Sequence, residues 1–463
     1  MATLIIDAYE GRSTSIVDFP GAYLHAKMPD EKRVLLKLRG QFVDIMCTVN
    51  PEYRTYVRYE KGVKVLYLRL LRALYGCLES ALLWYELYST TLVLMGFKLN
   101  PYDLCVANKM IRGSQCTIAF YVDDNKISHK SPEVVENVIS ELEKRFGKLS
   151  VQSNVKDFDF LGMDINIKKD KKIEISMKKQ ILEAIEWFGE RIDHKPATPA
   201  NKRLFSVNDE SEPLEESKKE IFHSVVAKLL YIAKRARPDV ETAIAFLCTR
   251  VSKSTESDWL KLKRVLGFLQ KTINDVRIIG AHNLQDLYTW VDAAYGVHDS
   301  DMRSHTGGCM SFGTGTVHQR SSKQKINVKS STEAELVGTS EYVPYNVWLR
   351  NFLEEQGYML SDNVLFQDNE SSIKMENNGR RSCTGNSRHV HIRYFFVKDL
   401  VDKKQIRVVY CPTLRMLADF FTKPLPGELY RFFRNIVMGY VSIVDLISGL
   451  SENKERVGKY NNK

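Results

Sequence analysis

The sequence predicts an α+β fold in its first half, a helical region after it, and a separate α/β unit with a mixed sheet in its second half. Three observations predict this architecture. Short apolar strands alternate with amphipathic helices in both halves of the chain. A polar stretch that contains prolines, residues 194–217, has the composition of a linker, and we expect it to be poorly packed and sensitive to proteolysis. The 463 residues are enough for two or three domains, each with its own core.

Apolar runs and turn residues place the elements of the first half. A helix is expected at 132–146, because Ser131 is a good N-cap, Pro132 suits the first helical position, and an apolar stripe follows. Residues 70–97 are also rich in helical pattern. The other expected elements are strands at 14–17, 117–122, 126–129, 160–167 and 173–177 and a helix at 178–188.

The second half begins with a helical block at 220–273 that breaks at 237–239. The elements expected after it are strands at 286–291, 364–367 and 406–410, a hairpin within 307–317, and helices at 332–356, 389–403 and 414–421. The expected domains are therefore 1–193, 218–283 and 284–426, with a linker at 194–217 and a tail at 427–463 that has no assigned role.

The composition is that of a soluble globular protein with a basic surplus. Hydrophobic residues make up 44% and charged residues 27%, and 67 Lys and Arg against 57 Asp and Glu give a net charge of +10. A surplus of this size fits a polyanionic partner, because basic side chains that neutralise phosphates release counterions. It is also found on surfaces that are merely solvated, so the charge alone does not decide between the two.

Several classes of protein are excluded by the sequence. The eight cysteines form no Cys-x-x-Cys pair, so neither a zinc ribbon nor a dense disulfide framework is expected. The N-terminus contains Asp7 and no long apolar run, which is unlike a signal peptide. The apolar stretch 81–97 is interrupted by Glu86, so we interpret it as a buried helix and not a membrane span. We expect an intracellular protein, cytoplasmic or nuclear, with no membrane partner.

Two adjacent carboxylates, Asp123 and Asp124, lie at a predicted hairpin tip after Tyr121-Val122. Carboxylates outside the core can meet hydrated Mg²⁺, which is usually held by one or two of them plus substrate phosphates. Asp18, at the end of the first strand, is placed to complete such a site. The alternative is a solvated turn with no ligand, which is the more frequent case for these four residues taken alone.

Four acids of the second half fall at the ends of expected elements: Asp292, Glu335, Asp368 and Asp419. Carboxylates from two strands and two helices can converge on one edge of a sheet, where they repel each other unless divalent cations neutralise them. Each acid also has a purely structural alternative. Glu335 could serve a capping box with Thr332, whereas Asp368 could cap the next helix and Asp292 could close a strand.

Ordered strings along the whole chain resemble the reverse transcriptase and ribonuclease H of copia-type retrotransposons. In the first part they are DFPGAYLH at 18–25, LYG at 74–76, YVDD at 121–124, FLG at 160–162, LLYIA at 229–233, RPD at 237–239 and WLKLKRVLGFL at 259–269. In the second part they lie at 290–296, 330–336, 367–373, 389–396 and 417–425. The resemblance implies a ferredoxin-like palm, then a helical thumb and connection, then a ribonuclease H domain.

In the palm, the resemblance implies that Asp18 and Asp123 hold two metal ions and that Asp124 acts at the primer end. Tyr23 would be the aromatic gate that excludes a ribose 2′-hydroxyl, unless it is only a packed tyrosine. Two departures weaken the expectation of polymerase activity. Only 17 residues precede Asp18, so we expect the N-terminal fingers, the protease and the integrase to be lacking. The family usually has Leu-Lys-Gln after its Tyr-Gly, whereas Leu78-Glu79-Ser80 follows Cys77 here, and a Glu where a neutral amide would face the nucleotide adds repulsion near phosphates.

In the nuclease, the resemblance implies four catalytic, metal-binding residues: Asp292, Glu335, Asp368 and Asp419. Each active site would take two Mg²⁺ ions, with Mn²⁺ as an alternative. His389 would contact substrate and help product release, or it would simply cap a helix. Ala294 stands where the family often has a second Asp, so no role is carried over to it.

The expected function is that of a copia-type RNA-directed DNA polymerase and ribonuclease H, with the nuclease the more active part. The expected partners are an RNA/DNA hybrid, a primed RNA or DNA template and, for an active polymerase, deoxynucleoside triphosphates. Two alternatives are kept: a non-catalytic relic of a decayed element that only binds nucleic acid, and a chain in which the nuclease alone is active.

Overall fold

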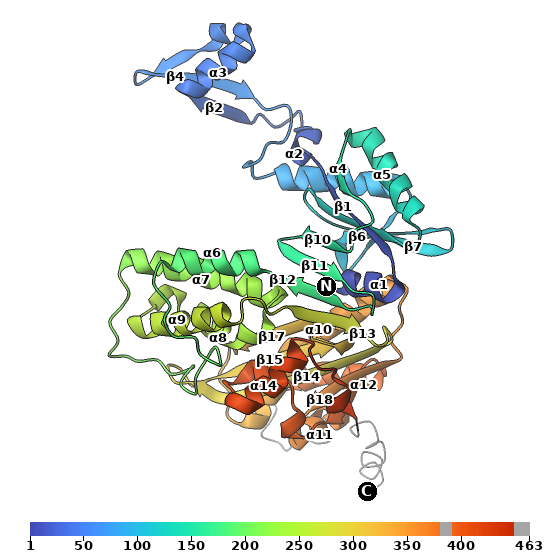
Figure 1. Ribbon diagram of the computed structural model, residues 1–463, viewed down its shortest axis with the longest axis vertical. Helices are drawn as coiled ribbons and strands as arrows, with labels where there is room; N and C mark the ends of the chain where they lie inside the picture. Colours follow the sequence, from blue (N-terminus) through green and yellow to red (C-terminus); the bar gives the residue numbers. More distant parts are fainter. Residues whose placement is uncertain (380–390, 449–463) are drawn as a thin grey trace. The chain divides into compact units, whose positions relative to one another are not determined.

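The computed structural model describes residues 1–379 and 391–448 (Figure 1). It divides into two compact units. One unit is Ser13–Val155, and the other joins Met1–Arg12 to the described chain from Lys156 onward. Both units mix helices with sheets, which confirms the expected α+β class. The division into compact units falls after Val155, within the first expected domain. The expected domain boundaries at 193, 217, 283 and 426 stay predictions.

The Ser13–Val155 unit is built on a six-stranded antiparallel sheet in the order β5-β6-β7-β8-β1-β9. The strands are β1 (Ser13–Asp18), β5 (Lys98–Asn100), β6 (Asp103–Ile111), β7 (Ser114–Tyr121), β8 (Asp124–His129) and β9 (Ser150–Gln152), and the helices are α2 (Ala22–His25), α4 (Ser80–Leu94) and α5 (Pro132–Phe146). The helices α4 and α5 share one core with the sheet. Phe19 packs edge-on against Tyr88 and Phe146, with ring centroids 5.1 and 5.4 Å away.

A smaller antiparallel sheet in the order β2-β4-β3 lies between α2 and α4 in the sequence, where the sequence pattern gave no elements. Its elements are β2 (Leu35–Arg39), α3 (Gln41–Val49), the 3₁₀ helix η1 (Pro51–Tyr56), β3 (Arg58–Glu60) and β4 (Val63–Arg69). Its core is small and consists of Val43, Cys47 and Leu66. Most side chains of β3 and β4 are partly or fully exposed, so hydrophobic periodicity is weak here.

The second unit contains a five-stranded sheet in the order β10-β11-β12-β13-β16. Its strands come from distant segments: β10 (Asp157–Phe160), β11 (Met163–Ile167), β12 (Ile173–Ser176), β13 (Arg277–Ala281) and β16 (Gly313–Thr314). The expected strand 160–167 is therefore two strands joined by a turn, in which Leu161 has φ 53° and Gly162 has φ 67°. Helix α1 (Ala2–Glu10) packs on β12 and β13.

The helical block forms as expected, with its break at Arg237. The helices are α6 (Lys178–Phe188), α7 (Glu216–Arg235), the 3₁₀ helix η2 (Pro238–Val240), α8 (Glu241–Cys248), the 3₁₀ helix η3 (Val251–Lys253) and α9 (Glu256–Lys271), and α6 to α9 are labelled in Figure 1. The expectation that 194–217 is poorly packed is wrong. Leu204, Phe205 and Leu214 are buried, and the Phe205 ring packs against the rings of Phe246, His298 and His305.

A mixed sheet in the order β17-β15-β14-β18-β19 organises the second half, as expected. The pairs β14·β15 and β15·β17 are antiparallel, whereas β14·β18 and β18·β19 are parallel. Its strands are β14 (Asp286–His298), β15 (Arg303–Ser311), β17 (His318–Lys323), β18 (Asp362–Gln367) and β19 (Arg407–Tyr410). Its helices are α10 (Ser331–Glu355), α11 (Glu370–Asn378), α12 (His391–Asp402), the 3₁₀ helix η6 (Thr413–Arg415) and α13 (Asp419–Thr422).

Two expectations about this sheet need correction. Asp292 does not end a strand, because β14 continues to His298 through antiparallel pairing with β15. The expected helix 414–421 is two short pieces, η6 and α13, separated by Met416 to Ala418. None of the helices within residues 1–379 and 391–448 combines the length and hydrophobicity that a membrane crossing needs.

The segment after residue 426 packs onto the second unit through α14 (Gly427–Val437), and α15 (Val444–Ile447) follows it. Tyr430, Phe433 and Ile436 of α14 are buried. The Asp239 carboxylate, itself buried, accepts two hydrogen bonds from Arg237, both 2.9 Å long, and one of 2.8 Å from Arg434 of α14. Burial alone would raise the pKa of Asp239, yet the two guanidinium groups hold this pKa below its usual range.

We expect Asp239→Ala to lower the free energy of unfolding by about 3–5 kcal/mol, because it leaves the buried Arg237 guanidinium without its carboxylate and removes one of the two carboxylates that pair with Arg434. The pKa of Asp239 is lowered by folding, so its contribution is present above the unfolded value of about 3.9 and lost as pH falls below it. Chemical denaturation at pH 7 measures the loss. Asp209→Ala, at an exposed position, is the control. Equal stability of the two variants would contradict this account.

Candidate active site

Three carboxylates meet at one edge of the mixed sheet. Asp292 comes from β14, Glu335 from α10, and Asp368 directly follows β18. One oxygen of each lies within 4.8 Å of the others. The parallel pairing of β14 with β18, which aligns Trp290 with Phe366, carries both strands to the same edge. Within residues 1–379 and 391–448, this is the one group of at least three acids, histidines or cysteines close enough to share an ion.

Asp419 belongs to the same cluster although it comes from the short helix α13. Burial and the negative charge of Asp292 raise the pKa of Asp419. Thr422, at the end of α13, donates a 2.6 Å hydrogen bond to Asp292 Oδ2. Lys423 Nζ lies 2.7 Å from Asp419 Oδ1. The structure therefore brings Asp292, Glu335 and Asp368 together, and Asp419 is linked to Asp292 through Thr422 and through the interaction of their charges.

Helix α13 is short and is held in place by hydroxyl groups from two other elements. Thr242 Oγ1 of α8 donates to the carbonyl of Phe420 at 2.8 Å, and Ser321 Oγ of β17 donates to that of Phe421 at 2.7 Å. Gly307 of β15 lets α13 approach closely, because a Cβ there would lie 2.7 Å from the backbone of Phe421. These contacts fix where Asp419 sits.

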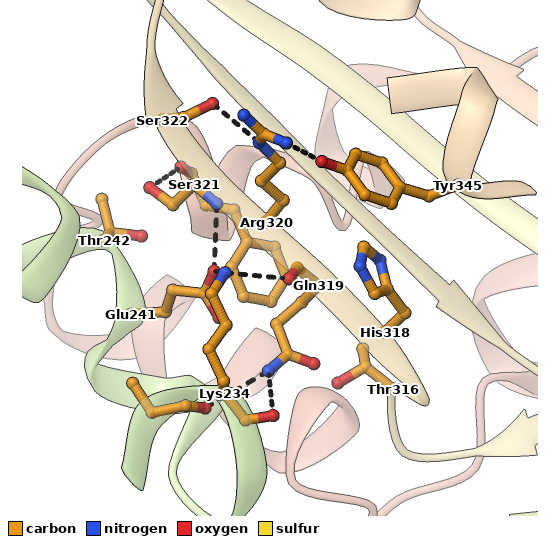
Figure 2. Close-up of polar contacts among 12 residues, drawn as sticks. Lys234, Glu241, Thr242, Thr316, His318, Gln319, Arg320, Ser321, Ser322 and Tyr345 are labelled. Carbon is orange, nitrogen blue, oxygen red and sulfur yellow. Dashed lines mark hydrogen bonds and ion pairs between the residues drawn. The ribbon is translucent and has the colours of Figure 1, made fainter. Parts of the chain in front are cut away.

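A buried ionic network couples α7 and α8 to the strand that contacts α13. Figure 2 shows the Glu241 carboxylate accepting the backbone N–H of Ser321, at 3.1 Å, and paired with the ammonium of Lys234. Lys234 also donates to the carbonyl of Gln319 at 3.2 Å. The Gln319 side chain in turn bonds Arg277 and the backbone carbonyls at the end of α7. The helical block and the edge of the mixed sheet are therefore one packed body.

The structural alternatives for Glu335 and Asp368 do not hold. The N-cap of α10 is Ser330, whose hydroxyl accepts a hydrogen bond from the N–H of Glu333, and the Glu333 carboxylate accepts one from the N–H of Lys329. Glu335 is therefore not needed as a capping residue. The N-cap of α11 is Asn369, so Asp368 is not a cap either. Asp368 instead accepts a 3.2 Å hydrogen bond from Thr413.

The cluster holds more negative charge than its surroundings compensate. Burial, then the charges of Asp292 and Asp368, raise the pKa of Glu335 well above its usual range. Burial and Asp292 also raise the pKa of Asp368, and they raise that of Asp419 to about 8. Glu335 Oε2 is buried and accepts no hydrogen bond. Clustered hard oxygen donors with an unsatisfied acceptor fit Mg²⁺ or Mn²⁺.

The acids of the Ser13–Val155 unit lie at the β7–β8 hairpin. Asp18 and Asp124 are directly opposed across β1 and β8, and burial and the charge of Asp123 raise the pKa of Asp18. The turn is Val122-Asp123 and not the expected 123–125, because Tyr121 and Asp124 already pair. Val122 has φ 58°, a strained value for a β-branched residue. Its carbonyl accepts a 2.6 Å hydrogen bond from the indole of Trp84, which helps hold this geometry.

The remaining predicted residues of this site have mixed outcomes. The Tyr23 ring packs against that of Tyr75, with centroids 4.4 Å apart, and Tyr75 donates a 3.3 Å hydrogen bond to Asp123. The charge of Glu79 is met by Lys32, 2.5 Å away, which reduces the repulsion expected from it. His389 lies outside the described residues. The roles of these residues in catalysis or substrate binding stay predictions.

Several residues that order the site were not predicted. Thr422 and Lys423 follow Asp419 within the matched string 417–425, and their proximity to that acid was the signal available. Thr242 and Ser321 gave no signal, because they lie 178 and 100 positions from the carbonyls that they contact.

Comparison with known proteins identifies the homologues. No family model matches the chain. The Pol polyprotein of transposon TNT 1-94 from Nicotiana tabacum is 25% identical over 387 residues, which are 81% of this chain and 28% of that protein. That of transposon RE1 from Arabidopsis thaliana is 28% identical over 371 residues, 79% of this chain and 24% of that protein. The Ty1-NL2 Gag-Pol polyprotein of Saccharomyces cerevisiae is 23% identical over 389 residues, 81% and 22%.

The homologues of this chain are thus retrotransposon Pol polyproteins, as the resemblance predicted, and the chain spans less than a third of their length. Among solved structures, a prototype foamy virus protease-reverse transcriptase matches 90% of this chain and 45% of its own, at 12% identity and a TM-score of 0.22.

We expect Mg²⁺ to stabilise the chain more at pH 8 than at pH 5. Folding raises the pKa of Asp419 to about 8, so without metal its contribution to stability is present below the unfolded pKa of about 3.9 and is lost as pH rises through 8. A cation that binds the ionised acids offsets that loss, by about 2.7 kcal/mol at a hundred times its Kd. Thermal denaturation with EDTA or Mg²⁺ at both pH values measures it. Equal shifts at both would contradict the prediction.

Proposed function

We propose that this chain is a ribonuclease H that hydrolyses the RNA strand of an RNA/DNA hybrid by a two-metal mechanism. The observation that carries the proposal is the convergence of Asp292, Glu335 and Asp368 within 4.8 Å, from a strand, a helix and the end of a parallel strand. The homology to retrotransposon Pol polyproteins supports the same enzyme class. Asp419 of helix α13 is the fourth acid of the proposed site.

The residues of the cluster would divide the work between holding ions and orienting ligands. Asp292, Glu335, Asp368 and Asp419 would hold the two cations. Bound divalent cations supply the positive charge that favours attack of water on a phosphodiester. Thr422 fixes the rotamer of Asp292, and Thr413 does the same for Asp368. Lys423 pairs with Asp419 and adds a positive charge at the edge where a scissile phosphate would enter.

Asp368→Asn should lower hybrid cleavage by more than about 100-fold, because a neutral amide cannot supply the charge that holds the cations, and losing even an outer-shell partner costs 10–100-fold. The assay uses purified chain, Mg²⁺ and a hybrid labelled on the RNA strand. Hybrid binding and the unfolding midpoint should stay close to those of the unmodified chain.

Asp123→Asn is the matched control, since it makes the same change at an acid of the other unit, and it should leave cleavage unchanged. Absence of cleavage by the unmodified chain, despite Mg²⁺ binding, would favour the alternative of a non-catalytic relic that only binds nucleic acid.

A second candidate function is RNA-directed DNA synthesis, and the approach of Asp18 to Asp123 and Asp124 favours it. In this proposal Asp18 and Asp123 hold the cations, Asp124 acts at the primer end, and Tyr23 gates the sugar. These acids are only partly buried and form no group of three. Mg²⁺ at such a site depends on oxygens from the incoming triphosphate.

Primer extension on a primed template should therefore be weaker than hybrid cleavage, and it should disappear in Asp123→Asn while Asp368→Asn leaves it intact. Measuring both activities in one preparation, with deoxynucleoside triphosphates present, compares them directly. Extension as efficient as cleavage would show that the polymerase site is fully formed and would reverse the proposed ranking.

A further inference from the structure

A groove of about 680 Å³ lies away from the acidic cluster, between helix α9 and the segment 192–208. This segment was expected to be an unpacked linker, but it folds back along α9 and forms one wall of the groove. Lys261 Nζ of α9 donates to the carbonyl of Ser206 at 2.6 Å, and Arg264 donates to Thr198 Oγ1 at 3.1 Å. The groove is therefore a built feature of this unit.

The residues that line this groove carry one sign of charge. Its ionisable residues are His194, Arg203, Lys261, Lys263 and Arg264, and no Asp or Glu lines it. Lys263 pairs with Glu190, 2.9 Å away, and Lys261 lies 3.9 Å from the carboxylate of Asp258. By contrast, within residues 1–379 and 391–448 no carboxylate lies at ion-pair distance from Arg203 or Arg264. The groove therefore has positive charge that the protein itself does not neutralise.

Arg264 has donor capacity that its neighbours leave unused. Its Nη2 reaches Thr198, but its Nε is buried and has no hydrogen-bond partner. Burial lowers the pKa of Arg264, so the guanidinium is held in a partly desolvated position. A guanidinium of this kind forms paired hydrogen bonds with the oxygens of a phosphate.

The groove also has an apolar side, to which Leu204, Val207 and Leu260 contribute. Leu260, on α9, is 65% exposed. An apolar surface beside several cations fits a ligand that offers both phosphates and sugar or base surface. Free phosphate would use the cations alone.

We propose that this groove binds the phosphodiester backbone of a nucleic acid, through Arg203, Lys261 and Arg264. The choice of an RNA/DNA hybrid as that nucleic acid rests on the proposed function, whereas the phosphate chemistry rests on the groove itself. The segment 192–208 then acts as part of the substrate-binding surface and not as a spacer between domains.

The test measures binding of a fluorescent RNA/DNA hybrid to the full chain by anisotropy, in EDTA so that no cleavage occurs. Arg264→Gln and Arg203→Gln should each weaken binding by about 3–10-fold and should lower the slope of log Kd against log salt concentration by about one. Arg203 is exposed, so its variant tests the groove even if Arg264→Gln fails to fold. Lys169→Gln, an exposed lysine in the β11–β12 turn, is the charge-matched control.

Three results would overturn the proposal. Wild-type affinity and salt slope in both groove variants would exclude the groove as a backbone site. An equal loss in the Lys169→Gln control would show that only total charge matters. Weaker binding of deoxyadenosine monophosphate with unchanged hybrid binding would assign the groove to a free nucleotide. Because these measurements need no catalysis, a chain that binds through the groove but does not cleave would refute the nuclease and leave the groove standing.

Discussion

The candidate active site requires several carboxylates to lie within a few ångströms of one another despite their mutual repulsion. The mixed sheet makes this possible, because the parallel pairing of β14 with β18 fixes Asp292 and Asp368 on rigid backbone at one edge. The long helix α10 adds Glu335 through its second turn, and its own cap is provided by other residues. The repulsion between the carboxylates lowers the stability of the folded chain without metal, and a bound cation would remove this repulsion and so bind more tightly.

The fourth acid shows how far the support for such a site extends. Asp419 sits on a helix of one turn, which cannot hold its position alone. The carbonyls of Phe420 and Phe421 in this helix accept hydrogen bonds from hydroxyl groups of α8 and β17. Glu241 of α8 joins those two elements through the network in Figure 2. The helices before the mixed sheet are therefore part of the structural support of the acidic cluster. The ionic contact between Asp239 and Arg434 extends this body to the segment after residue 426.

The groove formed by helix α9 and the segment 192–208 has a charge opposite to that of the acidic cluster. Helix α9 and the segment 192–208 present basic side chains, whereas the sheet edge presents acids. A nucleic acid needs both: cations along its backbone for affinity, and a cation-loaded carboxylate cluster for chemistry. The buried Leu204 and Phe205 explain how a polar, proline-containing segment can still form a fixed wall, since two apolar anchors offset the ordering of the residues around them.

The sequence alone determined most of the elements and the identity of the acids, because helix caps, apolar periodicity and short motifs are local properties. Helix α5 begins at Pro132 and α6 spans Lys178–Phe188 as the pattern predicts. What only the tertiary structure decided depends on pairs of distant residues. The length of β14 past Asp292 follows from pairing with β15, and the burial of Phe205 follows from its contacts with Phe246, His298 and His305. Likewise, Thr242 lies 178 positions from the carbonyl that it holds, and only folding brings such partners together.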